Sequence, residues 1–362
     1  MAVINKLKNI FSLSLPILFS GIFAISCDDH FFENEGDCDV HHYVRFVYDM
    51  NLKWADAFPS EVNSVNLYVF DRNNLFVKEY TGKGEELSKP GYQIELDLPK
   101  GEYSLLAWCG LRKDGATEES FTVPSPQPGV TTLQEMTATM ATQNVGVYND
   151  DPGVYSKKEL YFLYWGCIEV SLIDNHDGMV YYHDISLIKD TNHIRIILQE
   201  LSGEDMNPDD YEFSIEDANG VIGWNNDLIG NQVVTYQPWS QVDDEVGIGK
   251  IDTTDGTLTY VKGVVADLST SRLMAAMRGN VMLTISNHAS GDLIARVPII
   301  QYALLSKKYY ESAYHHEMTD QEFLDREDEY VMTFFLINGS WMNAYIDIQK
   351  WRIVLHDYGL GN

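Results

Sequence analysis

The sequence predicts an all-β protein built from antiparallel β-sandwich domains, and three observations support this fold class. Apolar and polar residues alternate with a period of two in several segments, which is the pattern of half-buried strands. Clusters of Asp, Asn, Gly and Pro separate those segments, as turns separate the strands of a sandwich. Aromatic residues make up 12% of the chain, including 22 Tyr, and aromatic residues favour strands over helices.

The strand pattern begins at residues 40–50, where one face carries Val40, His42, Val44, Phe46, Tyr48 and Met50. Further strands are expected at 65–69, 92–98, 103–109, 160–173, 193–201, 211–216, 232–236, 257–262, 281–287 and 293–300. Residues 331–337 and 345–355 are expected to form a hairpin. Two short helices are expected, at 131–142 and at 319–325, the second with Thr319 as its N-cap and Glu322 in the capping-box position.

The length of 362 residues predicts about two domains, because a domain usually has roughly 100–200 residues. A polar segment with turn chemistry at residues 148–157 marks the boundary between them. We therefore expect a signal peptide at 1–26, an acidic tether at 27–37, an N-terminal β-sandwich at 38–157 and a C-terminal β-sandwich at 158–362.

The first residues of the chain have the features of an export signal. Lys6 and Lys8 precede an apolar stretch at residues 10–25 that is short for a membrane-spanning helix. The stretch ends in Ala-Ile-Ser-Cys, which resembles the lipobox of bacterial lipoproteins, although Ala24 stands where Leu is usual. We predict cleavage before Cys27 and lipidation of its sulfur, because two or more acyl chains hold a protein stably on a membrane. The alternatives are a plain secretory signal and a membrane anchor helix.

An acidic run follows Cys27 and resembles the surface-export signal of Bacteroidetes lipoproteins. The simpler interpretation is a solvated tether, and the two are compatible. Residues 28–44 contain no Lys or Arg, and the first basic residue after Cys27 is Arg45. Arg45 lies in the middle of the first expected strand, where its backbone should be hydrogen-bonded in a sheet.

The charge of the chain excludes some partners. Lys and Arg number 25 against 54 Asp and Glu, which gives a formal net charge of -29. An acidic surface repels nucleic-acid phosphates and anionic lipid headgroups, so we expect no nucleic-acid partner and no electrostatic docking to membranes.

No recognisable catalytic motif stands in the sequence: GxSxG, HExxH and the Walker A pattern are all absent. The adjacent pairs His41/His42 and His315/His316 do not predict a metal site, because neighbouring strand residues face opposite sides. We therefore expect no enzyme activity, no metal and no cofactor. The seven Trp residues suit either sugar stacking or a core, and core positions are the commoner case.

The cysteines allow one candidate disulfide. Cys38 shares a strand face with Val44, and Cys109 shares one with Leu105, so both are expected to point into the first sandwich. Disulfides persist outside the cytoplasm, which makes a Cys38–Cys109 bridge a reasonable hypothesis. Buried free thiols are the equally weighted alternative, and Cys167 is left without a partner in either case.

Several motifs in order along the chain resemble the FimB-type minor fimbrial anchor family of Bacteroidales, which belongs to the fimbrillin superfamily of type V pili. They lie at residues 65–71, 75–77, 97–110, 270–274, 296–306, 324–336 and 346–355. The motif at 324–330 is the most specific of them. Its Arg326 is expected to pair with a carboxylate or a carbonyl where the next strand begins, which is a structural role.

The resemblance implies two tandem transthyretin-like sandwiches and no catalytic residues. It implies a surface-exposed outer-membrane lipoprotein that holds a pilus at its base and helps limit its length. Its partners would be pilin subunits, and related pilins join by β-strand addition. In those pilins an Arg-directed protease removes the first strand, which the missing basic residues at 28–44 would prevent here. A surface glycan-binding lipoprotein is the alternative function, and a secreted hydrolase is disfavoured.

Overall fold

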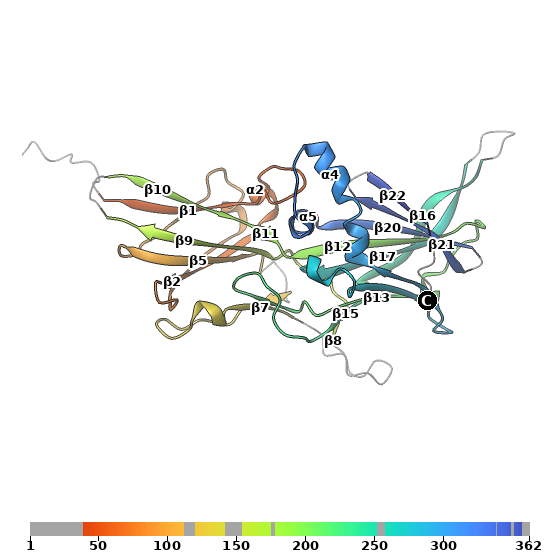
Figure 1. The fold of residues 1–362 in the computed structure, drawn as a ribbon, viewed down its shortest axis with the longest axis horizontal. Helices are drawn as coiled ribbons and strands as arrows, with labels where there is room; N and C mark the ends of the chain where they lie inside the picture. The colour runs from red at the N-terminus through yellow and green to blue at the C-terminus, as the bar shows by residue number, and fades with distance from the viewer. Residues whose placement is uncertain are drawn as a thin grey trace, which may run out of the picture. The chain divides into compact units, whose positions relative to one another are not determined.

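The computed structural model describes residues 39–111, 120–141, 154–174, 178–251, 258–337, 339–348 and 351–356. The chain divides into two compact units, residues 1–41 with 173–181, and residues 42–172 with 182–362. Nearly all of the described strands belong to the second unit, and Figure 1 shows how they are arranged.

The first sandwich consists of two sheets. The smaller has the order β10-β1-β4, formed by β10 (Val180–Ser186), β1 (His41–Val47) and β4 (Ile94–Glu95). The larger has the order β11-β9-β5-β2-β3, formed by β11 (Ile188–Lys189), β9 (Tyr164–Leu172), β5 (Gly101–Cys109), β2 (Ser64–Asp71) and β3 (Phe76–Lys83). Val44 and Phe46 of β1 share one core with Val65, Leu105 and Cys109 of the larger sheet.

The larger sheet of the first sandwich is buried on both faces. Tyr68 and Trp108 point away from the first core and join a second one. Phe121, Leu133 and Met140 belong to this second core, and they come from the segment that holds β6 (Phe121–Thr122), a 3-10 turn (Leu133–Glu135) and β7 (Thr137–Met140). This double burial explains why most residues of β2 and β5 are buried.

The second sandwich has a six-stranded sheet with the order β16-β17-β12-β20-β21-β22. Its members are β16 (Ser240–Ile251), β17 (Leu258–Ser271), β12 (Thr191–Glu200), β20 (Glu329–Ile337), β21 (Ser340–Ile348) and β22 (Trp351–His356). A five-stranded sheet has the order β19-β18-β13-β15-β8, with β19 (Leu293–Pro298), β18 (Met282–Asn287), β13 (Tyr211–Asp217), β15 (Val234–Tyr236) and β8 (Val154–Ser156). The pairs β12/β20 and β15/β8 are parallel, whereas the other pairs within these two sheets are antiparallel.

The described helices are short: α2 (Phe58–Glu61), α3 (Ile299–Ala303), α4 (Lys307–Tyr314) and α5 (Asp320–Arg326), with 3-10 turns at Gly84–Glu86, Pro208–Asp210 and Ala275–Met277. The Thr319 side chain caps α5 by accepting a hydrogen bond from the Glu322 amide, which confirms the predicted helix start. None of the helices in the described part of the chain combines the length and apolar character that a membrane crossing requires.

The all-β sandwich fold class is confirmed, but the sandwiches are interleaved along the chain. β9 pairs with β5, so strands on both sides of the predicted division at 157/158 share one sheet. β7 pairs with β14 (Val221–Gly223), so a segment from the first half joins strands of the second. Periodicity reveals a strand and its buried face, but it carries no information about the sheet that the strand joins.

Several local expectations differ from the structure. The strands expected at 92–98 and 293–300 are shorter, as β4 and β19, and α3 begins directly after β19. The expected helix at 131–142 is wrong, because this segment forms a 3-10 turn followed by β7. The expected strand at 345–355 is divided between β21 and β22, while its hairpin with β20 is present. Helix α4 and strand β16 were not predicted at all. β16 carries Asp243, Asp244 and Glu245 in a row, which hides the alternation of a strand.

Candidate functional site

β1, the first strand of the described residues, is the middle strand of its sheet, between β10 and β4. The Leu96 amide donates to the His42 carbonyl and the Leu187 amide to the Val47 carbonyl, each at 2.8 Å. Val44 and Phe46 are 0% and 4% exposed, and Tyr48 just beyond the strand is 1% exposed. Full burial of such side chains contributes about 1.5–3 kcal/mol each, so apolar contact holds β1 in place.

The outer face of β1 is fastened to β10 by charged and aromatic contacts. Arg45 lies in mid-strand, as expected, and its Nε and Nη2 donate to the two carboxylate oxygens of Asp184 at 2.6 and 2.8 Å. The Arg45 guanidinium lies 4.7 Å from the centre of the Tyr182 ring, on which Tyr43 also stacks. The Arg45 and Asp184 side chains are 44% and 50% exposed, so the pair orients Arg45 more than it stabilises the sheet.

His42 contacts His183 of β10 rather than forming a site with His41. The His42 Nδ1 and His183 Nε2 atoms are 3.0 Å apart, and burial together with the nearby His42 lowers the pKa of His183. Within the described ranges, the structure brings no group of three or more His, Cys, Asp or Glu residues close enough to hold a metal ion. The sequence offered no signal for this contact, because the two histidines are 141 positions apart.

The segment from α5 to β20 contacts the loop that follows β1. Arg326 donates to the Glu322 carboxylate at 3.0 Å and to the Asp49 carbonyl at 3.2 Å. Its guanidinium lies 4.0 Å from the centre of the Trp54 ring, and its own carbonyl accepts from the Leu52 amide. The expectation that Arg326 pairs with a carboxylate or a carbonyl is confirmed, and its partners tie the first sandwich to the second.

Arg272, Asp190 and the α5 residue Asp325 form a buried charge cluster. The Arg272 guanidinium donates to both oxygens of Asp325 at 2.8 and 2.9 Å, and its Nε lies 3.6 Å from the Asp190 carboxylate. Asn226 donates to Asp190 at 3.1 Å, and Arg272 donates to the Asn226 carbonyl. Burial disfavours the charged form and raises the pKa of Asp190 to about 7.

Lys189, at the end of β11, is the buried member of a second charge cluster. Its side chain is 3% exposed and its amine donates to the Asp328 carboxylate. The same nitrogen lies 3.6 Å from a Glu61 oxygen and 3.5 Å from the centre of the Phe162 ring. Tyr164 is the cross-strand partner of Lys189, and its hydroxyl donates to Glu61 at 3.2 Å. The charged pair Lys189-Asp190, directly after Leu187 and Ile188, is the sequence signal that could have located this cluster.

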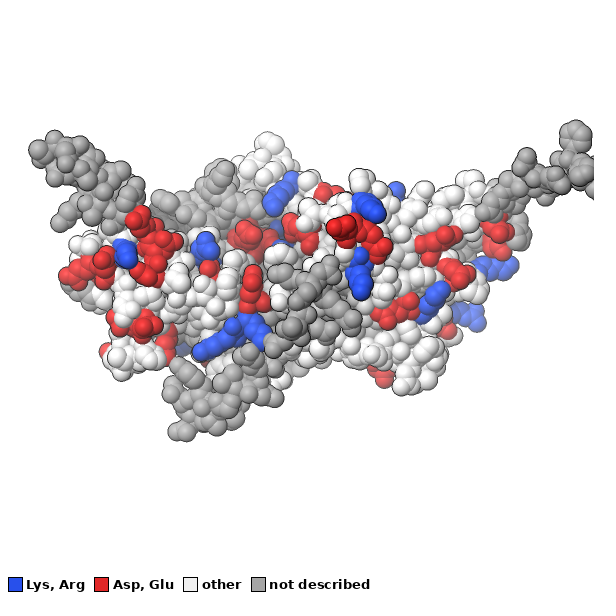
Figure 2. All heavy atoms as spheres, turned by 180° about the vertical axis from the view of Figure 1, so that it is seen from behind, with Lys and Arg blue, Asp and Glu red and all other residues white. Residues whose placement is uncertain are grey.

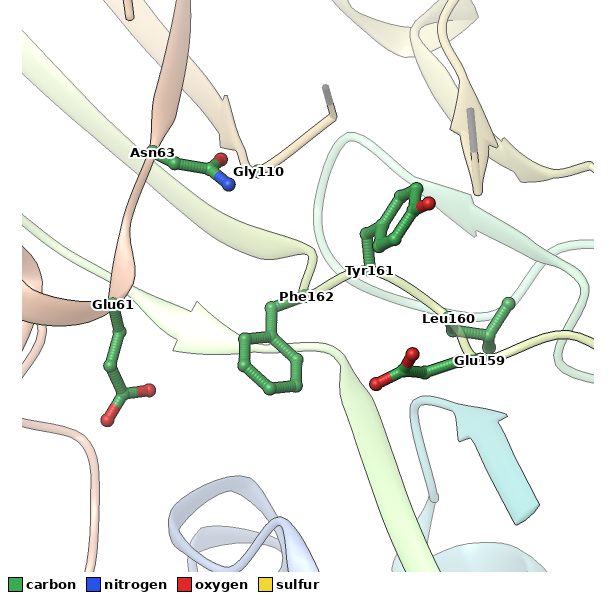
Figure 3. A pocket seen from close by; sticks show the side chains of 7 residues that line it. All are labelled: Glu61, Asn63, Gly110, Glu159, Leu160, Tyr161 and Phe162. Carbon is green, nitrogen blue, oxygen red and sulfur yellow. The ribbon is translucent and has the colours of Figure 1, made fainter. Parts of the chain in front are cut away.

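A cavity of about 170 Å³ opens beside the Lys189 cluster. Its lining is Glu61, Asn63, Gly110, Glu159, Leu160, Tyr161 and Phe162 (Figure 3). Figure 3 shows the Glu61 carboxylate and the Phe162 ring extending in the same direction from separate segments. Gly110 has a φ of +79°, and a Cβ atom there would meet the Phe162 carbonyl oxygen at 1.9 Å, so this approach of the two segments requires glycine.

The structure describes two of the four cysteines, Cys109 and Cys167. Cys109 is fully buried in the first core, as its strand face predicted, and burial raises the pKa of its thiol. Among the described residues, neither Cys109 nor Cys167 forms a disulfide. Cys38 and Cys27 lie outside the described residues, so the Cys38–Cys109 bridge and the lipidation of Cys27 stay predictions.

The charge excess is visible on the surface. Figure 2 shows Asp and Glu side chains spread along the face that it displays, with Lys and Arg side chains interspersed among them. Such a mixed, predominantly acidic surface keeps a protein soluble through charge repulsion and is screened by salt.

Taken together, these contacts define a protein of two β-sandwiches with interleaved strands, in which β1 is held inside its sheet. The model of the family described as fimbrillin-A associated anchor proteins Mfa1 and Mfa2 matches residues 34–357. The chain belongs to this family of fimbrial anchor proteins, which is a structural family and not an enzyme family.

The chain is also similar to individual proteins and solved structures. The minor fimbrium anchoring subunit Mfa2 of Porphyromonas gingivalis is 22% identical over 240 residues, covering 65% of this chain and 69% of that protein. A candidate adhesin from Bacteroides thetaiotaomicron is 32% identical and superposes with a TM-score of 0.73 over 89% of this chain and all of its own. A candidate polysaccharide-binding protein from the same species is 27% identical, with a TM-score of 0.70 over 88% of this chain and 99% of its own.

The solved structure of the fimbrial anchor protein Mfa2 from Porphyromonas gingivalis is 16% identical to this chain. It superposes with a TM-score of 0.60 over 89% of this chain and 100% of its own, which shows a shared fold. Family membership supports a fimbrial anchoring role, a location in the cell envelope and an association with fimbrial subunits.

Proposed function

We propose that this protein anchors a fimbrium at its base as an outer-membrane lipoprotein, attached through Cys27, and limits fimbrial length by ending the chain of subunits. The observation that carries the proposal is the position of β1, which is central in its sheet and buries Val44 and Phe46. A subunit that keeps its first strand keeps the segment that links its body to the lipid, and leaves no empty groove for a further subunit.

Attachment to the fimbrium would proceed by β-strand addition at a free sheet edge. β22 is the last described strand of the chain and lies at the edge of the six-stranded sheet. An edge strand presents a row of backbone N–H and C=O groups that a strand of another subunit can pair with. Because β1 stays in its own sheet and β22 offers a free edge, the subunit would join the fimbrium through one end only. This suits a position at the base.

Limited proteolysis with an Arg-specific protease tests whether β1 is retained. We expect the folded mature protein to resist cleavage after Arg45, since a protease needs an extended and accessible backbone. Asn34→Arg places a basic residue in the acidic tether and serves as the control, which should be cut there. Rapid cleavage after Arg45 of the wild type, with the body still folded, would make the chain resemble a shaft subunit instead.

Metabolic labelling with a palmitate analogue tests the lipid attachment. The wild type should incorporate the label and partition with outer membranes, whereas Cys27→Ala should not. Equal labelling of the two proteins would show that Cys27 is not the lipid site.

Glycan binding is the second candidate function, favoured by the similarity to a candidate polysaccharide-binding protein. A cavity of about 220 Å³ beside β1 combines the aromatic rings of Phe58 and Tyr92 with the charged groups of Arg45, Lys89 and Asp184. Aromatic faces and charged hydrogen-bonding groups are suitable partners for sugars. Purification of the lipidated protein from outer membranes separates the functions, because an anchor should retain pilin subunits and a glycan receptor should retain glycan-transport proteins.

A further inference from the structure

The cluster of Lys189, Asp328 and Glu61 has the composition of a reaction centre rather than of a simple ion pair. An amine and a carboxyl group are in direct contact, and a second carboxyl group lies 3.6 Å from the amine nitrogen. We propose that the Lys189 amine and the Asp328 carboxyl condense to an intramolecular amide bond, with Glu61 as the acid–base group. The bond is a modification of this chain and does not depend on the proposed anchoring role.

The three groups come from separate parts of the fold. Lys189 ends β11 in the first sandwich, and Glu61 ends helix α2 beside it. Asp328 lies between α5 and β20 of the second sandwich, and its carbonyl accepts a hydrogen bond from the His193 amide at 2.7 Å. The backbone on both sides is therefore fixed, which holds the reacting atoms together as a near-attack arrangement requires.

The surroundings of the Lys189 amine exclude water, which favours condensation with the carboxyl group. The side chain is 3% exposed, the Phe162 ring lies 3.5 Å from the nitrogen, and the Tyr164 ring lies 6.0 Å away. The two rings shield the amine from water and weaken its solvation. In the proposed step the ammonium gives one proton to the carboxylate, which leaves a nucleophilic amine beside an electrophilic carboxylic acid.

Glu61 is placed to move the remaining protons. As the Lys189 nitrogen attacks the Asp328 carboxyl carbon, Glu61 takes a proton from that nitrogen and returns it to the departing hydroxyl group. One C–N bond forms, one C–O bond breaks and one water molecule leaves, so the step needs no oxidant or co-reactant. The Tyr164 hydroxyl donates to Glu61 at 3.2 Å, and the cavity lined by Glu61 and Phe162 (Figure 3) offers space for the released water.

Mass spectrometry of the denatured full-length protein tests the bond directly. Trypsin should release residues 159–195 joined to residues 327–350 as one species, lighter than the two peptides by one water, with no cleavage after Lys189. Separate peptides ending at Lys189 and spanning 327–350, at their unlinked masses, would show that the contact is an ordinary ion pair and would overturn the proposal.

Three variants assign the roles. Lys189→Arg keeps the positive charge but removes the amine, and should abolish the linked species. Glu61→Gln keeps both reacting groups and should abolish or greatly slow the linkage, so full linkage in this variant would refute the role of Glu61. Lys53→Arg is the matched control, because Lys53 also approaches Glu61, at 3.9 Å, from an exposed position, and it should leave the linkage complete.

Discussion

β1 and β20 are both interior strands of their sheets, but the charged contacts beside them differ in burial. The charged contact of β1, Arg45 with Asp184, is about half exposed. The charged contact beside the start of β20, Arg272 with Asp325, has side chains that are 8% and 9% exposed. Exposed ion pairs contribute little, whereas breaking a buried one leaves an uncompensated charge. Apolar burial therefore holds both strands, since Met332 and Phe334 of β20 are also 1% exposed, and a buried polar network is added only beside the start of β20.

Arg272→Ala should give the largest effect and tests the second half of this comparison. The substitution leaves the carboxyl groups of Asp190 and Asp325 buried without their cation, so we expect a loss of about 3–5 kcal/mol in the free energy of unfolding. Urea denaturation followed by far-UV circular dichroism measures this loss. Arg278→Ala removes an exposed pair with Asp320 and should cost less than about 1 kcal/mol. Similar losses in the two variants would contradict the distinction.

Glu327→Gln should change how stability depends on pH. Glu327 is 1% exposed, and burial with nearby Asp328 and Glu329 raises its pKa to about 8. The folded state thus binds a proton that the unfolded chain has released by pH 7, and stability should fall as pH rises from about 5 to about 8. At about 1.4 kcal/mol per pKa unit, this loss amounts to a few kcal/mol.

The measurement for Glu327 is the urea midpoint at several pH values. Glu327→Gln should flatten the profile and exceed the wild type in stability at pH 8, because a neutral amide replaces a buried charge. Asp217→Asn is the comparison variant, since burial raises the pKa of Asp217 to about 7 at a site remote in sequence. A wild-type midpoint that rises between pH 5 and 8 would contradict the assignment.

The two regions also differ in what the sequence could predict. The period-two pattern located β1 and its buried face, and the capping residues located α5, because both signals are local. The contacts of Arg45 with Asp184 and of Arg272 with Asp190 join residues that only the sheet order brings together. The motif at 324–330 showed that Arg326 needed a partner, yet its contact with Asp49 arises from the packing of the two sandwiches.

Arg326→Ala should have an intermediate effect, because its partners span both regions. The variant loses two hydrogen bonds and the stacking on Trp54, and we expect a loss of about 1–3 kcal/mol in the free energy of unfolding. Thermal denaturation measures it, and co-purification of pilin subunits should be unchanged. A variant that is as stable as the wild type but loses its partner would make the motif a binding site.

Asp184→Ala should have the smallest effect and is the sharpest test of how β1 is held. The variant frees the Arg45 guanidinium but leaves the Arg45 peptide bond in place for a protease. The lost pair is about half exposed, so the free energy of unfolding should fall by less than about 1 kcal/mol. Cleavage after Arg45 by an Arg-specific protease should stay as slow as in the wild type, because Val44 and Phe46 keep the strand in its sheet. Phe46→Ala is the matched variant, since removing a buried aromatic side chain costs about 3–5 kcal/mol and should speed cleavage. If Asp184→Ala were cut rapidly while Phe46→Ala resisted, the exposed ion pair, and not apolar burial, would keep β1 in its sheet.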